Sequence, residues 1–408
     1  MNIFLVGNGF DLQHGFPTRY FDFLQVGYFL SKKYSSDLDT VGKVLGNEML
    51  HSADRYIEED YKLHKTIYDK TSIQPDLLSD ISKKAKKNMW FQYLHACINR
   101  DINWIDFETE ISQVLSSFRA FFNDDDRHFQ LSPNGEILFD LTEHPSNARD
   151  RYIISQFDFF FEPTGDYIGR TKVNRLLGEY AVEYPLGSGV YDLNTEKIIS
   201  TLYTALRELV DLLKGYLLCF VEEPMKKMVE NNITPKCPSL PEIGHVVSFN
   251  YTNTFEILYN AIHVEHIHGI VTDNIVLGIN PDKDDDIFDM DTSFLMFKKY
   301  FQRTFFKTDI GFLRKIKGIQ KTSKSGLIEL YTIGHSLDIT DEDIIRQLFD
   351  LANKITVFYH SETSAQNLIR NLVRIYGKNE FDNLRESKEL RFHPQAPVGW
   401  NYGHQETT

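Results

Sequence analysis

Two polar side chains in the segment HVVSFNYTNTFEILYNAIHVEHIHG, residues 245–269, stand where a chemical site would be expected. Asn250 follows an apolar run that predicts a buried strand, and His268 follows a second predicted strand, His263–Ile267. A helix over Phe255–Ile262, with Thr252 as its N-cap, completes a βαβ unit with parallel strands. The carboxamide and the imidazole would then share the sheet edge at which open α/β sheets bind ligands.

The N-terminus has the same order of a strand followed by small and polar residues. Asn2–Val6 predicts a buried strand, after which come Gly7, Asn8, Gly9, Phe10 and Asp11. Glycines directly after a strand let the backbone approach a phosphate, and a following helix N-terminus favours an anion. The third glycine of the dinucleotide fingerprint is replaced by Leu12, so a plain βα turn is the alternative. We expect nucleotide binding here, because Asn8 and Asp11 add hydrogen-bonding groups that a plain turn does not need.

Further strands are predicted in the C-terminal half of the chain, at Asn274–Leu277, Leu327–Ile333 and Lys354–Tyr359. In a parallel sheet their ends would meet those of the earlier strands and form a nucleotide cleft. The residues expected to line this cleft, besides the glycine turn, are Thr252, Gly269, Gly278, His335 and Ser336. Two histidines leave alternatives open. His335 could line the ligand or cap a helix, and His266 could support or replace His268 or be a satisfied core histidine.

Between the first and second strands the periodicity is helical. Helices are predicted over Tyr20–Leu30, Asp76–Ile98, Ile105–Phe122 and Asn194–Val221, the last stopped by Pro224. The fold class is therefore α/β, a mostly parallel Rossmann-like sheet flanked by helices, with a large α-helical insertion. Residues 1–30 and 243–380 would form the core, residues 31–242 the insertion, and residues 381–408 a C-terminal tail that frays. A covering helix is expected at Phe294–Phe312, and others at Asp341–Leu351 and Ala365–Tyr376.

The amino-acid composition limits the classes of function that the chain could have. A chain of 408 residues with 42% hydrophobic and 25% charged residues is that of a globular protein. The net charge of −14, from 44 basic and 58 acidic residues, disfavours general nucleic-acid binding. The three scattered cysteines predict neither a disulfide framework nor a four-cysteine zinc module. The chain starts with a strand and contains no long apolar run, so we expect a cytoplasmic protein without membrane contact.

Carboxylates offer a second kind of chemistry. Asp106 and Glu108 lie near Trp104 at a predicted helix start, and residues 282–291 are rich in aspartate. With Asp11 they could form a metal-dependent nuclease, whereas the structural alternatives are helix capping and a solvated loop. The aspartate spacing matches no calcium loop, and we expect no metal.

Motifs along most of the chain resemble the AbiH family, named for abortive infection against bacteriophage. They are NIFLVGNGFDLQHGFPTRYFDF, WIDFE, SFNYTNTFE, HIHG with LGIN, and YTIGHSLDITDEDI. AbiH proteins in turn resemble the sirtuin-type NAD-binding fold, whose glycine-rich, Asn-containing and His-Gly segments correspond here to Gly7–Gly9, Asn250-Tyr251 and His268-Gly269. Two departures are the lack of the sirtuin zinc cysteines, which argues against deacetylation, and Asp11 in place of a small polar residue.

This resemblance implies an antiphage protein that hydrolyses NAD to nicotinamide and ADP-ribose when triggered. Asn250 would orient ribose or water, His268 would be the base, and NAD or a related ADP-ribose nucleotide would be the substrate. A phage or host protein would act through the helical insertion, and homo-oligomerisation is left open. The alternatives are a nucleotide-sensing module without catalysis and, third, the metal-dependent nuclease.

Overall fold

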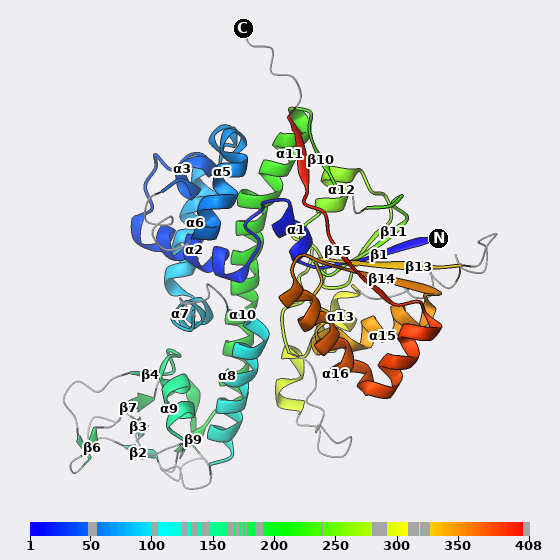
Figure 1. The fold of residues 1–408 in the computed structure, drawn as a ribbon. Coiled ribbons are helices and arrows are strands. Elements are labelled where there is room, and N and C mark those ends of the chain that lie inside the picture. Colours follow the sequence, from blue (N-terminus) through cyan, green and yellow to red (C-terminus); the bar gives the residue numbers. More distant parts are fainter. Residues whose placement is uncertain are drawn as a thin grey trace. The chain divides into compact units, whose positions relative to one another are not determined.

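The computed structural model describes residues 1–47, 55–98, 105–124, 129–131, 137–139, 145, 147–161, 167–168, 171–172, 174–176, 178–183, 191–237, 240–279, 292–308, 318 and 327–402. The chain divides into two compact units. The first comprises residues 1–81, 213–276 and 302–408, and the second comprises residues 82–212 and 277–301. Figure 1 labels their helices and strands. The domain boundaries expected from the sequence differ from these units and stay a prediction.

The first unit is built on a six-stranded parallel sheet in the order β12-β11-β1-β13-β14-β15. The strands are Val264–His266 (β12), His245–Ser248 (β11), Asn2–Val6 (β1), Glu329–Ile333 (β13), Lys354–Tyr359 (β14) and Arg391–Pro394 (β15). Strand β1 reads as a continuous apolar run because it lies inside the sheet, paired on both sides and covered on both faces. The prediction of a parallel sheet flanked by helices is confirmed.

Alternate residues of β1 supply two separate cores, because successive side chains of a strand point to opposite faces. Ile3 and Leu5 join a core with α15 (Glu342–Leu351) and α16 (Glu362–Ser387), the orange helices of Figure 1. Phe4 and Val6 join a second core on the opposite face. It includes Phe10 of α1 (Gly9–Gln13) and Phe255 of α12 (Thr254–Tyr259). Helices therefore cover both faces, and all strands present their C-terminal ends at one edge.

The first unit contains further helices and a separate two-stranded sheet. They are α2 (Tyr20–Lys33), α3 (Val41–Leu45), α5 (Arg55–Lys70), α11 (Glu223–Glu230), β10 (Ile233–Lys236) and β16 (Gly399–Tyr402). Three helices have residues in both units: α6 (Pro75–Lys87), α10 (Thr195–Leu217) and α13 (Lys299–Phe306).

The second unit contains α7 (Met89–Ala96), α8 (Phe107–Phe122), α9 (Ala148–Ser155) and a 3₁₀ turn at Thr292–Phe297. It also contains short antiparallel strands where the sequence predicted only helices. They are β2 (Phe129–Leu131), β3 (Ile137–Phe139), β4 (Phe160–Phe161), β5 (Tyr167–Ile168), β6 (Thr171–Lys172), β7 (Asn174–Leu176), β8 (Ala181–Glu183) and β9 (Tyr191–Leu193). Strands of two or three residues are too short to give a recognisable alternation, so the prediction of a helical insertion missed them, and the insertion itself stays a prediction.

Two predicted helices are interrupted. The one expected over 76–98 breaks at Asn88, whose side chain accepts a hydrogen bond from the Phe91 amide and thereby caps α7. The one expected to stop before Pro224 instead passes from α10 through a π-helical turn, Leu218–Glu222, into α11. Pro224 lies in the first turn of α11, where a missing N–H is tolerated.

Other expectations are corrected near the sheet. Residues 274–277 are no strand of the sheet and make only an isolated bridge between Gly269 and Ile275. The cap of α12 is Asn253 rather than Thr252. The expected frayed tail is wrong for residues 381–402, because α16 continues to Ser387, β15 joins the sheet and β16 pairs with β10. Of the helix expected over 294–312, α13 covers Lys299–Phe306, and residues 309–312 lie outside the described residues.

Candidate active site

The ends of four neighbouring strands bring the predicted residues of the first unit together. Strand β1 leads into the glycine turn, β11 into Phe249 and Asn250, β12 into His268, and β13 into His335. The Phe249 ring lies edge-on to both imidazoles, with centroid distances of 5.1 Å to His268 and 4.4 Å to His335. Asn250 and the two histidines thus follow neighbouring strands at the C-terminal edge of the sheet, as the sequence predicted, and Phe249 packs between the histidines.

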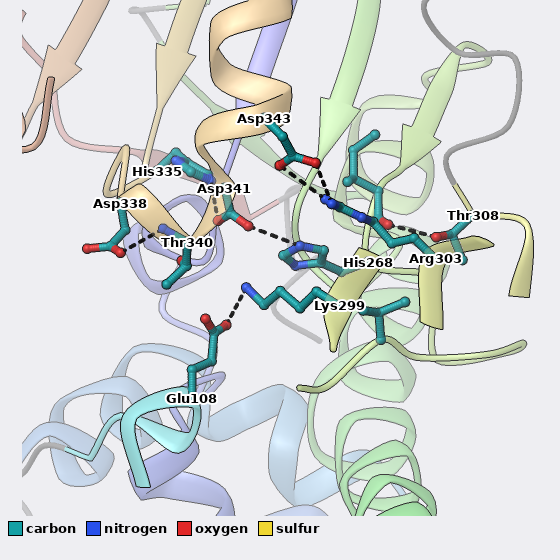
Figure 2. Close-up of polar contacts among 12 residues, drawn as sticks. Glu108, His268, Lys299, Arg303, Thr308, His335, Asp338, Thr340, Asp341 and Asp343 are labelled. Carbon is teal, nitrogen blue, oxygen red and sulfur yellow. Dashed lines mark hydrogen bonds and ion pairs between the residues drawn. The ribbon is translucent and has the colours of Figure 1, made fainter. Parts of the chain in front are cut away.

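Asp341 lies between these two imidazoles. Its Oδ1 is 3.2 Å from Nε2 of His268, and its Oδ2 is 3.6 Å from Nε2 of His335, as Figure 2 shows. The His268 contact has the distance of an ion pair but not the angle of a good hydrogen bond. All three residues are buried, with exposed fractions of 6–7%. The carboxylate can attract a proton on either ring.

The orientation of His335 is fixed from several sides. Its Nδ1 accepts a hydrogen bond from the Leu337 amide at 2.9 Å, so the neutral ring carries its proton on Nε2, the nitrogen that faces Asp341. A Cβ added at Gly7 would lie 2.6 Å from the His335 Cα and 2.9 Å from its Cδ2. Gly7 therefore has to be glycine for His335 to occupy this position.

The glycine turn packs tightly against the segment that follows β13. The Gly9 amide donates to the Gly334 carbonyl at 2.8 Å, and the Gly7 amide donates to the Ile333 carbonyl at 3.2 Å. A Cβ at Gly9 would come within 2.8 Å of the same Gly334 oxygen. Both glycines thus have a packing role, and their amides already have acceptors within the protein. A phosphate held by this turn would have to use other donors.

Asp11 lies at the buried end of the same turn. Its Oδ2 accepts a hydrogen bond from the Thr252 hydroxyl at 2.5 Å. The Thr252 hydroxyl in turn accepts a hydrogen bond from the Thr254 hydroxyl at 3.1 Å. Burial raises the pKa of Asp11 to about 6, against the opposing effect of the hydrogen bond from Thr252 and of the nearby polar groups of Thr254 and Asn250. The carboxyl group therefore changes charge close to neutral pH.

Asn250 has its backbone held and its side chain uncommitted. Its amide N–H donates to the Ser248 hydroxyl at 3.2 Å, and its carbonyl lies 3.1 Å from Nδ1 of His266. The carboxamide is 6% exposed and contributes to the polar surroundings of Asp11, yet neither its oxygen nor its nitrogen forms a well-aligned hydrogen bond within the described part of the chain. A buried amide in this state has donor and acceptor capacity for a ligand.

His266 supports this arrangement from outside it. Its Nε2 is 2.8 Å from Oε1 of Glu256, and its Nδ1 contacts the Asn250 carbonyl. The ring is half-buried and spans α12 and the end of β11. Both ring nitrogens of His266 therefore have partners, and its role toward His268 stays a prediction.

The other predicted binding residues lie in several different surroundings: in the core, in a turn, on the surface and in the second unit. Phe10 packs in the core against Phe255, with stacked rings 4.4 Å apart, and Gly269 is required by a turn with φ +78° beside the Asn274 carbonyl. Asn8 is exposed and donates to the Thr18 carbonyl at 3.3 Å, and Ser336 is also exposed. Gly278 belongs to the second unit.

The carboxylates of the nuclease alternative have structural partners. Asp106 caps α8 by accepting from the amides of Glu108 and Thr109, and Glu108 pairs with Lys299 at 2.6 Å, both within the second unit. Asp11 belongs to the first unit, and the aspartates of residues 282–291 lie outside the described residues. Among the described residues no group of three or more His, Cys, Asp or Glu could hold a metal ion.

Sequence reasoning missed Asp341, Thr254 and Glu222. Glu222 is 1% exposed and accepts from both the amide and the side chain of Asn253, at 2.9 and 2.8 Å. The acidic run DITDED, residues 338–343, which begins one residue after Gly334-His335-Ser336, was the signal for Asp341, but it is also typical of an ordinary acidic helix start. Nothing in the sequence near Glu222 marks it, since it joins the site only through the π-helical turn.

A cavity of about 670 Å³ lies elsewhere in the first unit. Its lining includes Met1, Asn2, His245, Tyr259 and His263, which belong mainly to the starts of β1 and β11 and to the segment after α12. This is the opposite edge of the sheet from Asn250 and His268. The cavity therefore does not coincide with the candidate active site.

Comparisons with known proteins give one match. The family model described as "Bacteriophage abortive infection AbiH" matches residues 3–360. No curated protein and no solved structure matches the chain significantly. A search of the described residues for a helix long and apolar enough to cross a membrane finds none.

Proposed function

The chain belongs to the AbiH family of bacteriophage abortive-infection proteins, which gives it a role in abortive infection, and we propose that it fills this role by hydrolysing NAD to nicotinamide and ADP-ribose. The observation that carries the proposal is that Asn250, whose buried carboxamide forms no well-aligned hydrogen bond within the described residues, and the His268–Asp341 pair follow the neighbouring strands β11 and β12 at the C-terminal edge of a parallel sheet. Such edges are where open α/β sheets bind nucleotides.

The strand order supports a nucleotide as the ligand. Numbered along the chain, the six strands lie in the order 3-2-1-4-5-6, which is that of doubly wound dinucleotide-binding sheets. The direction of winding reverses between β1 and β13, and the glycine turn and His335 follow these two strands. Ligands of such sheets bind at this reversal point.

The chemistry asks little of the protein beyond positioning and charge stabilisation. When the glycosidic bond breaks, its electron pair goes to the nicotinamide nitrogen, which loses its positive charge and needs no proton. Water then forms the new bond to the ribose C1′, and its proton goes to the imidazole of His268 as general base. The Asn250 carboxamide orients ribose or water, and the buried surroundings strengthen its hydrogen bonds.

The test is incubation of the pure protein with NAD, followed by chromatography for nicotinamide and ADP-ribose. Asn250→Ala and His268→Ala are expected to lower nicotinamide release by about 100-fold or more while the fold is retained. His263→Ala is the matched control, because His263 lies exposed at the opposite edge of the sheet and should leave the rate unchanged. Normal release from either site variant would remove that residue from the mechanism.

Cells complete the test, because an abortive-infection protein can idle until it is triggered. NAD should fall after phage infection in cells that carry the wild-type chain and should persist in cells that carry the Asn250 variant. Binding of NAD without consumption, both in the tube and in infected cells, would favour a nucleotide-sensing module. Loss of activity with EDTA would instead favour metal-dependent chemistry.

A further inference from the structure

We propose that Asp341 is a positioning residue for His268 and that His335 holds Asp341 in place. The catalytic meaning of this inference rests on the proposed function, whereas its structural content does not. The three residues come from separate places in the first unit: His268 follows β12, His335 follows β13, and Asp341 ends a 3₁₀ turn, Ile339–Asp341, before α15.

The carboxylate of Asp341 does not cap the helix that it precedes. Asp341 occupies the N-cap position of α15, where an aspartate normally accepts a hydrogen bond from a first-turn amide, but its side chain makes no capping bond. The neighbouring Asp338 does cap, accepting from the Thr340 amide at 3.1 Å. Because Asp338 caps the turn that leads into α15, the carboxylate of Asp341 is not needed as a cap and faces the two histidines instead.

Contacts on several sides hold the His335 ring in place. Its Nδ1 accepts from the Leu337 amide, and Gly7 and Phe249 pack against the residue, so its protonated Nε2 faces Oδ2 of Asp341 at the ion-pair distance of 3.6 Å. The second oxygen of the carboxylate then faces Nε2 of His268 at 3.2 Å. A proton on that nitrogen is favoured by the carboxylate, which leaves Nδ1 of a neutral His268 ring as its basic atom.

The charged groups on the elements around this array have partners of their own. Asp343, in the first turn of α15, forms an ion pair with Arg303 of α13, and Thr308 donates to the backbone carbonyl of Ile267 at 2.9 Å (Figure 2). His266, before His268, pairs with Glu256. Removing the charge of Asp341 therefore changes the direct carboxylate contact of His268 and leaves these pairs in place.

The experiment reads the histidine ring directly, in the full-length protein without ligand. Long-range proton–nitrogen NMR of nitrogen-labelled histidines reports which ring nitrogen is protonated, and His268→Gln identifies the His268 signal. In the wild type, the neutral His268 ring is expected as a single tautomer protonated on Nε2. In Asp341→Asn it is expected as a mixture of both tautomers, whereas Asp338→Asn should leave the signal unchanged. An unaltered His268 signal in Asp341→Asn would overturn the inference.

A second variant keeps the inference testable if Asp341→Asn does not fold. His335→Asn retains an acceptor for the Leu337 amide at the position of Nδ1 but cannot reach Asp341. It should also mix the His268 tautomers, and a retained single tautomer would refute the anchoring role of His335. Circular dichroism of each variant establishes that the fold is kept.

Measurement of NAD turnover distinguishes failure of this inference from failure of the proposed function. If NAD is the substrate, Asp341→Asn should lower kcat by about 100- to 10,000-fold with little change in KM, since Asp341 acts through His268. A changed tautomer together with no NAD consumption by the wild type, in the tube or during infection, would reject the proposed function and keep the positioning role. Unchanged kcat in an active enzyme would reject the positioning role alone.

Discussion

At the scale of single residues, the unusual group is Asp11. The side chain is fully buried, and its Oδ2 accepts a hydrogen bond from Thr252. Burial raises its pKa from an ordinary value of 3.8 to about 6. The folded protein therefore binds a proton at Asp11 more tightly than the unfolded chain does. The stability that this carboxyl group contributes is fully present below about pH 4 and is lost as the pH rises through about 6.

Asp11→Asn should remove this pH dependence. Relative to the variant, the wild type is expected to lose about 1 to 2 kcal/mol of its free energy of unfolding between pH 5 and pH 8. Urea denaturation of both proteins at the two pH values measures the difference, and Asp338→Asn provides the comparison with a partly exposed aspartate. A constant difference between wild type and Asp11→Asn across this range would contradict the raised pKa.

At the scale of elements, the glycine turn and the end of β13 form one tightly fitted pair. Gly334 has φ +65°, and a Cβ at this position would lie 2.1 Å from the Phe10 nitrogen and 2.5 Å from the Gly9 carbonyl carbon. Neither contact can relax by rotation of a side chain, because both involve backbone. The sequence predicted that both glycine segments lie at one edge of the sheet, but it gave no sign that their backbones touch, because direct contact depends on how the two turns pack.

Gly334→Ala should therefore destabilise the first unit by about 2 kcal/mol or more, through left-handed strain and backbone displacement. The control is Gly399→Ala, where an added Cβ meets nothing within 4 Å. Thermal unfolding measures both variants. Equal unfolding temperatures for the two would show that the turn adjusts without cost.

At the scale of the whole first unit, distant parts of the chain meet at a small cluster of rings. His14 follows α1, His64 belongs to α5, and Trp400 belongs to β16; His64 and Trp400 have ring centroids 4.9 Å apart. Nε2 of His64 donates to the His14 carbonyl at 2.6 Å. Burial lowers the pKa of both histidines to about 4, so the folded unit holds them neutral.

Acid should weaken this cluster. A histidine with a lowered folded pKa contributes stability that is present above about pH 6.5 and is lost as the pH falls toward 4. His64→Gln keeps a donor for the His14 carbonyl but cannot be protonated. Between pH 7 and pH 5 the wild type should lose about 2 kcal/mol more than this variant does.

Chemical denaturation at the two pH values provides the measurement, with His360→Gln as the control because His360 is exposed. That control should retain the acid sensitivity of the wild type. Equal losses for the wild type and His64→Gln would mean that His64 does not titrate below its ordinary range.

The sequence by itself determined the parallel sheet, the boundaries of β1 and β14, and the placing of Asn250, His268 and His335 at strand ends, because these follow from local apolar runs and the residues that end them. The short strands of the second unit and the fold of residues 381–402 were missed, because pairing with remote segments forms them. The approach of Asp341 to two histidines and the contact of Gly9 with Gly334 were decided only by the tertiary structure. Hydrophobic periodicity specifies which residues are buried and in which element, whereas contacts between remote residues depend on how the strand ends pack.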